Sequence, residues 1–230
     1  MGIFGFRAQS TDITPSAASS ATAVNTAVSA DTGKESREAD PQHAATAVIF
    51  LGNPGPDYEY TRHNAGRLLA ETFPGNYRNK FKGLFAPVPL TLNGGTKTPF
   101  FLIPETYMNR SGESAAALLS FYKIPPARCL VVHDEIELPL GTVALKWSGG
   151  LGGHNGLRSL KACLGTADFW RLRIGIGRPP HNNIADWVLS PFSPGEQAVL
   201  HDALAVSKDL LIQAVFGHAQ EGKLSSCSVP

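Results

Sequence analysis

The amino-acid sequence predicts an α/β fold: a single globular domain whose mixed, mostly parallel, twisted sheet is flanked by helices on both faces. From residue 46 onward, short apolar runs of strand length alternate with longer segments whose apolar residues recur at helical spacing. Some of the apolar runs are continuous, as is typical of strands buried on both faces. With 230 residues, 43% of them hydrophobic, the chain suits one domain of roughly 150 to 200 residues and a tail.

The first 45 residues differ from the rest of the chain. They are rich in Ala, Ser and Thr and show no sustained periodicity, which predicts a disordered tail. An organellar transit peptide is the alternative, because such peptides are rich in Ser and contain Arg. They contain few acids, however, and this segment has Asp12, Asp31, Glu35, Glu38 and Asp40. We therefore expect a tail over 1–45, a folded domain over 46–217 and a C-terminal tail over 218–230.

The first half of the domain begins with a continuous apolar run, residues 47 to 51, which predicts a buried strand. A helix is expected over 64 to 73, where apolar residues recur at helical spacing. Strands near 88 to 92 and 99 to 103 and a helix near 112 to 122 follow. Each of these segments is short enough for a compact layered domain.

The second half continues the alternation. The expected elements are a buried strand over 129 to 133, a strand over 141 to 147, a Gly-rich turn at 149 to 153, a helix that carries Leu157, Leu160 and Leu164, and an alternating strand over 171 to 177. The last helix opens with Ser193-Pro194-Gly195-Glu196, a capping box with Pro at the first helical position, and runs to about Phe216.

Composition limits the partners and the compartment. Twenty Lys and Arg against nineteen Asp and Glu give a formal net charge of +1, so any nucleic-acid contact must come from a local basic patch. Three cysteines form no C-x-x-C pair, which disfavours a disulfide framework or a zinc ribbon and fits a reducing compartment. No apolar stretch approaches the ~20 residues that a membrane span requires. We expect a cytoplasmic protein, or an organellar one if the tail is a transit peptide.

Polar loops follow several of the predicted strands. In open α/β sheets, ligands bind beyond the carboxyl ends of the strands. Three loops there are unusually polar, residues 52 to 64, 104 to 112 and 133 to 139, and a fourth, 149 to 156, precedes a helix. Together they form the candidate site.

His63 is the strongest catalytic candidate in these loops. An imidazole titrates near neutral pH and serves as a general base or acid, although a histidine at a helix start can also be only a cap. A base works better when a carboxylate holds its other ring nitrogen. Asp134, at the end of a different buried strand, is the leading candidate for that role, and Glu135 and Glu137 are competitors.

Three asparagines, Asn53, Asn109 and Asn155, each lie in one of the polar loops, within two residues of Gly or Ser. An amide both donates and accepts, so such a group can bind a peptide backbone or stabilise a carbonyl oxygen that becomes negative. The alternative is that Asn favours turns for reasons of its own backbone. The repeated occurrence at strand ends favours a binding role.

The absence of several motifs narrows the chemistry. The sequence has no G-x-S-x-G, H-E-x-x-H or catalytic-cysteine signature, and its Gly-rich segments fit neither a P-loop nor G-x-G-x-x-G. A water activated by His63 remains. The glycines near 149 to 153 either let a helix N-terminus face an anion or carbonyl, or only make a tight connection.

Six basic residues cluster in the second half of the chain. They are Lys146, Arg158, Lys161, Arg171, Arg173 and Arg178. Such residues usually form a solvated face, but next to the Gly-rich loop they could bind phosphates.

Five motifs carry a family resemblance. The segments GNPGPDYEYTRHNAG, PETYMNRSGES, VVHDEIELPLG, GGLGGHNGLRSL and FWRLRIGIGRP resemble, in order, content and spacing, the bacterial-type peptidyl-tRNA hydrolases. The resemblance covers residues 46 to 217. It implies a monomeric enzyme without metal or cofactor that hydrolyses the ester between a peptide and the terminal ribose of tRNA, thereby recycling tRNA from stalled chains for translation.

The resemblance also implies roles for individual residues. His63 looks like the family's catalytic histidine and Asp134 like the carboxylate that holds it. Asn53, Asn109 and Asn155 match asparagines that position the peptide and the ester carbonyl, Tyr58 and Met108 line the cleft, and Lys146 and Arg173 bind the terminal phosphate of the tRNA. Ala144 departs from the pattern, because relatives often have a basic residue there. The alternative is a non-catalytic, RNA-binding relative that acts in splicing.

Overall fold

The computed structural model describes residues 44–179, 183–222 and 224–226. The expected N-terminal tail lies outside these residues except for Ala44 and Ala45, which are buried against the domain. The strands are β1 (Ala47–Phe50), β2 (Arg78–Lys80), β3 (Gly83–Pro87), β4 (Leu90–Leu92), β5 (Gly95–Lys97), β6 (Phe100–Pro104), β7 (Cys129–Glu135), β8 (Thr142–Trp147), β9 (Trp170–Gly175) and β10 (Leu224–Ser226). The helices are α1 (Ala65–Glu71), α2 (Ser111–Tyr122), α3 (Asn155–Leu164), α4 (Ile184–Leu189) and α5 (Pro194–Phe216).

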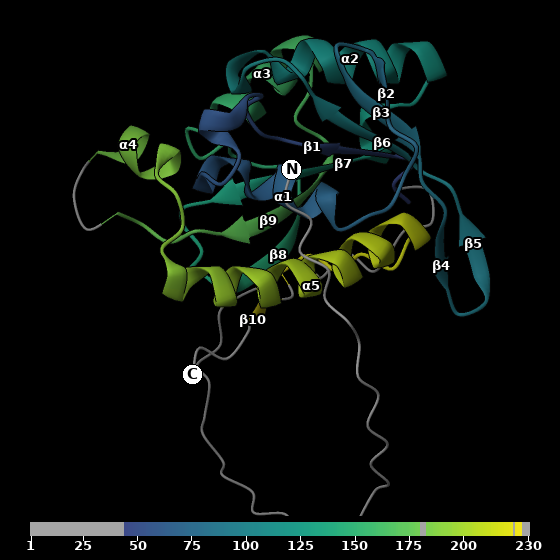
Figure 1. Cartoon of the computed structure of the whole chain (residues 1–230). Coiled ribbons are helices and arrows are strands. Elements are labelled where there is room, and N and C mark those ends of the chain that lie inside the picture. Colours follow the sequence, from purple (N-terminus) through teal and green to yellow (C-terminus); the bar gives the residue numbers. More distant parts are fainter. Residues whose placement is uncertain (1–43, 180–182, 223, 227–230) are drawn as a thin grey trace, which may run out of the picture. The chain divides into compact units, whose positions relative to one another are not determined.

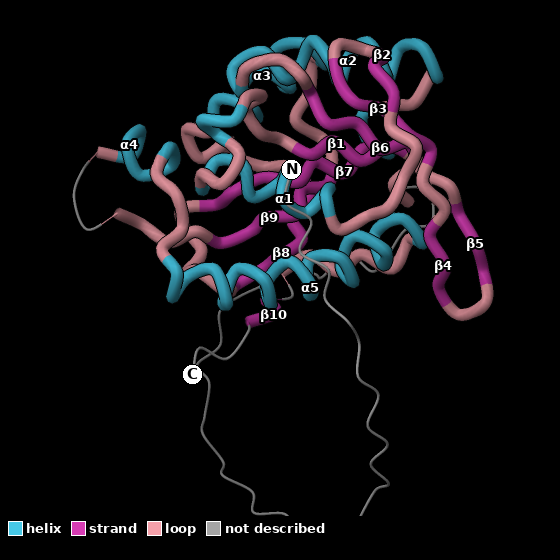
Figure 2. The backbone as a smooth tube through the Cα atoms, viewed as in Figure 1, coloured by secondary structure: helices cyan, strands magenta, loops and turns pink. Residues whose placement is uncertain are grey.

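Eight strands form one mixed sheet in the order β10-β8-β9-β7-β1-β6-β3-β2, and β4 and β5 form a separate hairpin. The sheet twists through the centre of the domain, as Figure 2 shows. The four central strands, β9, β7, β1 and β6, run parallel, whereas β10, β8, β3 and β2 pair antiparallel at the two edges. The prediction of a mixed sheet is confirmed, but only its centre is parallel. Whether two neighbouring strands are parallel or antiparallel depends on which strands pair, and the local sequence pattern does not encode that pairing.

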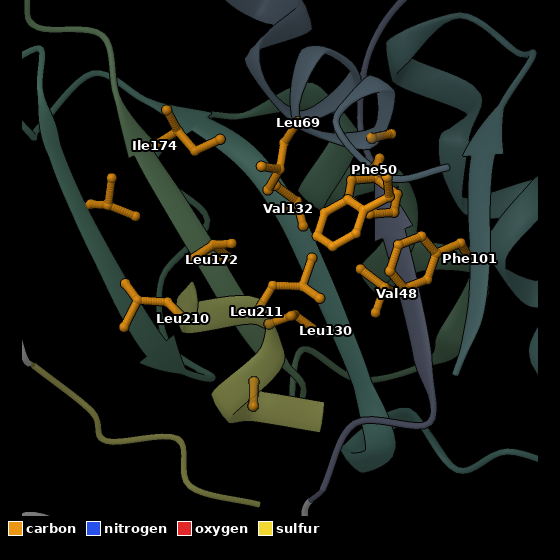
Figure 3. Close-up of a cluster of buried hydrophobic side chains, with 14 of the residues drawn as sticks. Val48, Phe50, Leu69, Phe101, Leu130, Val132, Leu172, Ile174, Leu210 and Leu211 are labelled. Carbon is orange, nitrogen blue, oxygen red and sulfur yellow. The ribbon is translucent and has the colours of Figure 1, made fainter. Parts of the chain in front are cut away.

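Helices cover both faces of the sheet, as predicted (Figure 1). Side chains alternate along β1, so Val48 and Phe50 face α1 and α5, while Ile49 faces α2 and α3. The first of these two cores, shown in Figure 3, is the larger, and it joins strand residues such as Leu172 to Leu211 of α5. The long helix α5 begins with the predicted capping box, in which the Ser193 N–H donates to Glu196 Oε2 at 2.8 Å.

The expected C-terminal boundary at residue 217 falls just after α5 ends at Phe216. The sheet nevertheless continues beyond it, because β10 pairs with β8 in the register Leu224 opposite Ala144. Strands β2, β3 and β5 and the short helix α4 were not predicted. Each is between three and six residues long, too short for a clear periodicity. Among the described residues, no helix combines the length and the apolar character needed to cross a membrane.

Gly66 determines how closely α1 approaches the sheet. A Cβ added at this position would lie 2.6 Å from the carbonyl oxygen of Val132 on β7 and 2.8 Å from that of Leu51, just after β1. Real Cβ atoms do not come so close to backbone, so only glycine fits. The 3-10 turn Arg62–Asn64, which leads into α1, is thereby placed directly at the carboxyl ends of β1 and β7.

Candidate active site

His63 and Asp134 meet at the carboxyl ends of the central strands. His63 lies in the 3-10 turn and Asp134 near the end of β7, and His63 Nδ1 is 2.8 Å from Asp134 Oδ1. Both residues are buried, with 8% and 3% of their surface exposed. The two competing carboxylates pair elsewhere: Glu135 accepts from Arg173 Nε at 2.9 Å, and Glu137 pairs with Arg178.

His154 was not selected from the sequence, yet it joins the same carboxylate. Its Nε2 is 3.0 Å from Asp134 Oδ1. Its Nδ1 accepts the backbone N–H groups of Gly156 at 3.1 Å and Leu157 at 3.4 Å, which makes His154 the N-cap of α3. A nitrogen that accepts carries no proton, so the proton of the neutral ring is on Nε2 and is donated to Asp134. The only sequence signal was its position just before the predicted helix.

Asp134 Oδ1 therefore accepts from two imidazoles. Burial alone would raise the pKa of the Asp134 carboxyl, but the charges and hydrogen bonds of His63 and His154 hold it far below its ordinary value. Burial lowers the pKa of His63, and the charge and hydrogen bond of Asp134 outweigh it, so that the pKa of His63 is raised. With its Nδ1–H bonded to Asp134, the neutral His63 ring presents the lone pair of Nε2, which has no hydrogen-bond partner among the described residues.

His133 is buried next to Asp134 and His154. It is 2% exposed, its Nδ1 lies 2.7 Å from the backbone oxygen of Asp134, and its ring packs edge-on against His154 at a centroid distance of 5.0 Å. Burial, followed by the charge of His154, keeps the pKa of His133 well below its ordinary value. His133 is therefore a neutral donor at physiological pH and supports the backbone that carries Asp134.

Asn53 links two of the polar loops. Its Oδ1 accepts the N–H of Met108 at 2.8 Å, and its own backbone exchanges two hydrogen bonds with the side chain of Asn64, at 2.8 and 3.0 Å. Asn64 is fully buried and was not singled out from the sequence. Because Oδ1 of Asn53 is occupied, its Nδ2–H group is the part that remains for a ligand.

The other residues expected to contact substrate differ in exposure. Asn109 and Asn155 are exposed, and Asn155 is the first residue of α3. Tyr58 is half-buried and packs edge-on against the exposed Tyr107 at 6.5 Å. Met108 is buried in the core under α2 and α3. Tyr107, next to the buried Met108, is 59% exposed and was not predicted from the sequence to contact substrate.

A pocket of about 350 Å³ opens beside the two histidines. It lies between the end of β7, the Gly-rich loop before α3, and α4. Its lining includes His63, Asp134, His154, Asn155, Arg158, Ile184, Ala185 and Val188. The Nε2 of His63, unpaired among the described residues, therefore lies at the edge of this cavity, and the opposite wall, formed by Ile184, Ala185 and Val188 of α4, is apolar.

The basic residues of the second half do not act as one group. Arg171 is 2% exposed and donates to the carbonyl oxygens of Gly149 and Gly150, so it holds the Gly-rich loop. Arg173 and Lys146 are half-buried on β9 and β8, beside the buried Ala144. The predicted phosphate-binding pair is thus brought to one face of the sheet, where Arg173 is already bonded to Glu135 through Nε.

The imidazole–carboxylate group has the residue types of a metal site. His63, Asp134 and His154 place one ligand atom each within 4.8 Å of one another. In this structure, however, those atoms are joined directly by hydrogen bonds of 2.8 and 3.0 Å. The arrangement suits a base oriented by a carboxylate.

The sequence is similar to that of known proteins over most of the described domain. The model of the family described as peptidyl-tRNA hydrolase matches residues 47–226. The peptidyl-tRNA hydrolase of Treponema pallidum is 52% identical over 174 residues, which are 73% of this chain and 86% of that protein. That of Azoarcus is 46% identical over 164 residues, covering 68% of this chain and 72% of that protein.

A solved structure shows the same fold. The crystal structure of peptidyl-tRNA hydrolase from Acinetobacter baumannii has a TM-score of 0.68 and 35% sequence identity, and the match covers 76% of this chain and 90% of that one. The five motifs, the family match and the shared fold lead to one conclusion: the chain belongs to the peptidyl-tRNA hydrolase family.

Proposed function

We propose that this peptidyl-tRNA hydrolase cleaves the ester between peptide and tRNA with a water molecule that His63 activates. The observation that carries the proposal is the state of the His63 ring. Its Nδ1 is fixed by Asp134 at 2.8 Å, while Nε2 is without a partner among the described residues and the side chain lines the pocket. A neutral imidazole in this arrangement is a general base with a defined proton-accepting atom.

The reaction follows from that arrangement. His63 Nε2 takes a proton from water as the water oxygen attacks the ester carbonyl carbon, and the imidazolium that forms is stabilised by the Asp134 carboxylate. The tetrahedral intermediate then collapses, the carbon–oxygen bond to the ribose breaks, and the proton on Nε2 passes to the ribose oxygen. The products are the peptide carboxylic acid, which ionises by releasing the second proton of the water to solvent, and a tRNA with its terminal hydroxyl restored.

The asparagines supply donors for the substrate. We assign Asn155, which lines the pocket beside His63, to the ester carbonyl, whose oxygen becomes negative during the reaction. Asn53 through Nδ2 and the exposed Asn109 bind the peptide backbone, and Tyr58 and Met108 shape that side of the cleft. His154 keeps Asp134 ionised and in place.

Lys146 and Arg173 are assigned to the phosphates of the acceptor stem near the CCA end, because both lie on the face formed by β8 and β9. The buried Ala144 between them offers no charge. We further propose that the protein acts as a monomer in the cytoplasm, with an organelle as the alternative if the N-terminal segment directs transport.

The proposal is tested by release of tRNA from a purified N-blocked aminoacyl-tRNA. The intact chain is expected to hydrolyse this substrate. His63→Ala is expected to lower kcat about 10²–10⁴-fold, and Asp134→Asn is expected to lower kcat by a smaller factor. Equal turnover by His63→Ala would remove His63 from the role of base. Absence of turnover by the intact chain, with tRNA binding retained, would instead favour the RNA-binding alternative.

A further inference from the structure

We propose that Arg62 is a positioning residue that fastens the turn carrying His63 to the α4 wall of the pocket. This inference rests on the proposed role of His63 as the base. It concerns a residue next to the base in sequence whose side chain points to contacts more than 120 residues away along the chain.

The Arg62 side chain is enclosed by polar partners. It is 4% exposed, and its Nη2 donates to both oxygens of Glu196, at 3.0 and 2.8 Å, while Nε donates to Ser190 Oγ at 3.3 Å. The backbone takes part too, because the Arg62 N–H donates to the Ser190 carbonyl at 3.0 Å. The 3-10 turn of His63 is thus tied by main chain and side chain to the segment between α4 and α5.

Two aromatic rings complete the enclosure. The guanidinium carbon of Arg62 lies 3.8 Å from the ring centroid of Trp187 and 4.9 Å from that of Phe192. A planar guanidinium stacks on such rings while separate N–H groups in its plane reach two different acceptors, here Glu196 through Nη2 and Ser190 through Nε. The ammonium of lysine is instead a point charge on a flexible stem. The site therefore requires arginine in particular, and not a positive charge in general.

The partners of Arg62 belong to elements that shape the pocket. Trp187 lies in α4, and three other residues of this helix, Ile184, Ala185 and Val188, line the pocket together with His63. Trp187 Nε1 also donates to the carbonyl of Gly177, beyond β9, at 2.9 Å. Glu196 is at the same time the acidic partner in the capping box of α5. One side chain thus joins the catalytic turn, the pocket wall and the start of α5.

The position of His63 depends on this attachment. The His63 ring must keep its 2.8 Å contact with Asp134 and present Nε2 to the pocket. Arg62 precedes His63 in the same three-residue 3-10 turn. A shift of the Arg62 side chain therefore moves the backbone that carries the His63 ring. The effect expected from its loss is a weaker contact between His63 and Asp134, together with a displaced pocket wall.

The test measures kcat, KM and the pH profile of tRNA release for Arg62→Lys, Trp187→Leu and Trp187→Phe, well below the unfolding temperature of each. Arg62→Lys is expected to lower kcat at least tenfold and to raise KM. Its acidic limb should move to lower pH, as in Asp134→Asn, because His63 loses part of the influence of the carboxylate. Trp187→Leu should resemble it, and Trp187→Phe, which keeps a ring for stacking, should recover most of the kcat.

A stability control separates positioning from simple destabilisation. Val215→Ala removes buried side-chain volume near the other end of α5, and it should lower Tm while leaving kcat and the pH profile unchanged. Wild-type kcat and an unmoved pH profile for Arg62→Lys, with only a lower Tm, would overturn the proposal. So would equal losses in Trp187→Leu and Trp187→Phe. A failure of His63 as the base is recognised separately, by full activity of His63→Ala.

Discussion

The imidazole rings of His63 and His154 lie 4.8 Å apart, centroid to centroid, and both bond the same oxygen of Asp134. His63 lies in the 3-10 turn before α1, and His154 is the N-cap of α3. Two loops that are far apart in the sequence therefore converge on one carboxylate. The shared oxygen fixes Nδ1 of His63 as a donor and leaves Nε2 for the substrate side.

The pH dependence of hydrolysis should reflect the raised pKa of His63. The base must be neutral, so kcat/KM is expected to fall as the pH drops through a value above the ordinary histidine pKa of about 6.5. Asp134→Asn removes the charge that raises this pKa and should move the acidic limb to lower pH. A flat acidic limb, or one that Asp134→Asn leaves in place, contradicts the assignment.

His154→Asn tests the second imidazole. Asparagine is a good N-cap, so α3 should be retained, but the hydrogen bond from His154 Nε2 to Asp134 is lost. The carboxylate then interacts more strongly with His63 alone, and we expect the acidic limb to move to higher pH with a several-fold fall in kcat. His154→Ala is the control, because it should additionally lose about 1 kcal/mol of stability with the cap. An unchanged pH profile in both variants would show that His154 only caps the helix.

The free energy of unfolding should also depend on pH through Asp134 and His63. The depressed pKa of Asp134 means that its ionised form contributes stability above the unfolded-state pKa of about 3.9, and this contribution is lost as the pH falls. The raised pKa of His63 has the opposite sign: its contribution is present below the unfolded-state pKa and lost as the pH rises through the folded-state value. The unfolding free energy of the wild type relative to Asp134→Asn should therefore peak at mildly acidic pH. A difference that is constant with pH would argue against the coupling.

Arg173→Ala is expected to weaken tRNA binding more at low salt than at high salt, since phosphate contacts are screened by ions. The matched control is Arg178→Ala, which removes an exposed arginine that also pairs with a carboxylate. It should change the affinity and its salt dependence less. A loss of affinity in Arg173→Ala that does not depend on salt would indicate that the residue acts through packing with Glu135.

Gly66→Ala should destabilise the fold by about 1–3 kcal/mol, because the new methyl group meets two carbonyl oxygens at 2.6 and 2.8 Å. Gly195→Ala, in the first turn of α5, meets no atom within 4 Å, and should instead be neutral or stabilising by up to about 1 kcal/mol. Urea unfolding of both variants measures the difference. Equal effects would mean that α1 can move away from β1 and β7 at little cost.

The sequence predicted those parts of the site that local patterns carry. Strand β1 and helix α5 were identified because apolar runs and a capping box are local signals. His63 was identified as an imidazole in a polar loop at a helix start, and Asp134 as a carboxylate at the end of a buried strand. The hydrogen bond between His63 and Asp134 was only a hypothesis from the sequence, because the two residues are 71 positions apart and only the fold brings them together. Family resemblance, rather than pattern, provided the roles of Tyr58, Met108, Lys146 and Arg173.

Other residues were missed for physical reasons. His154 looked like a loop residue, and only the tautomer imposed by its capping bonds makes it a donor to Asp134. Arg62 looked like part of a motif, but its partners Trp187 and Glu196 lie more than 120 residues later, and no local pattern links them. The sequence predicted a mixed sheet but not which strands are antiparallel, because pairing across long sequence distances sets the strand order.

The most direct test of the account is the single-turnover rate of ester hydrolysis with enzyme in excess over N-blocked aminoacyl-tRNA, for the wild type and for His63→Ala. This measurement isolates the chemical step from substrate binding and product release. His63→Ala is expected to slow hydrolysis by about 10²–10⁴-fold while the affinity for tRNA is unchanged. Equal single-turnover rates for the two proteins would contradict it.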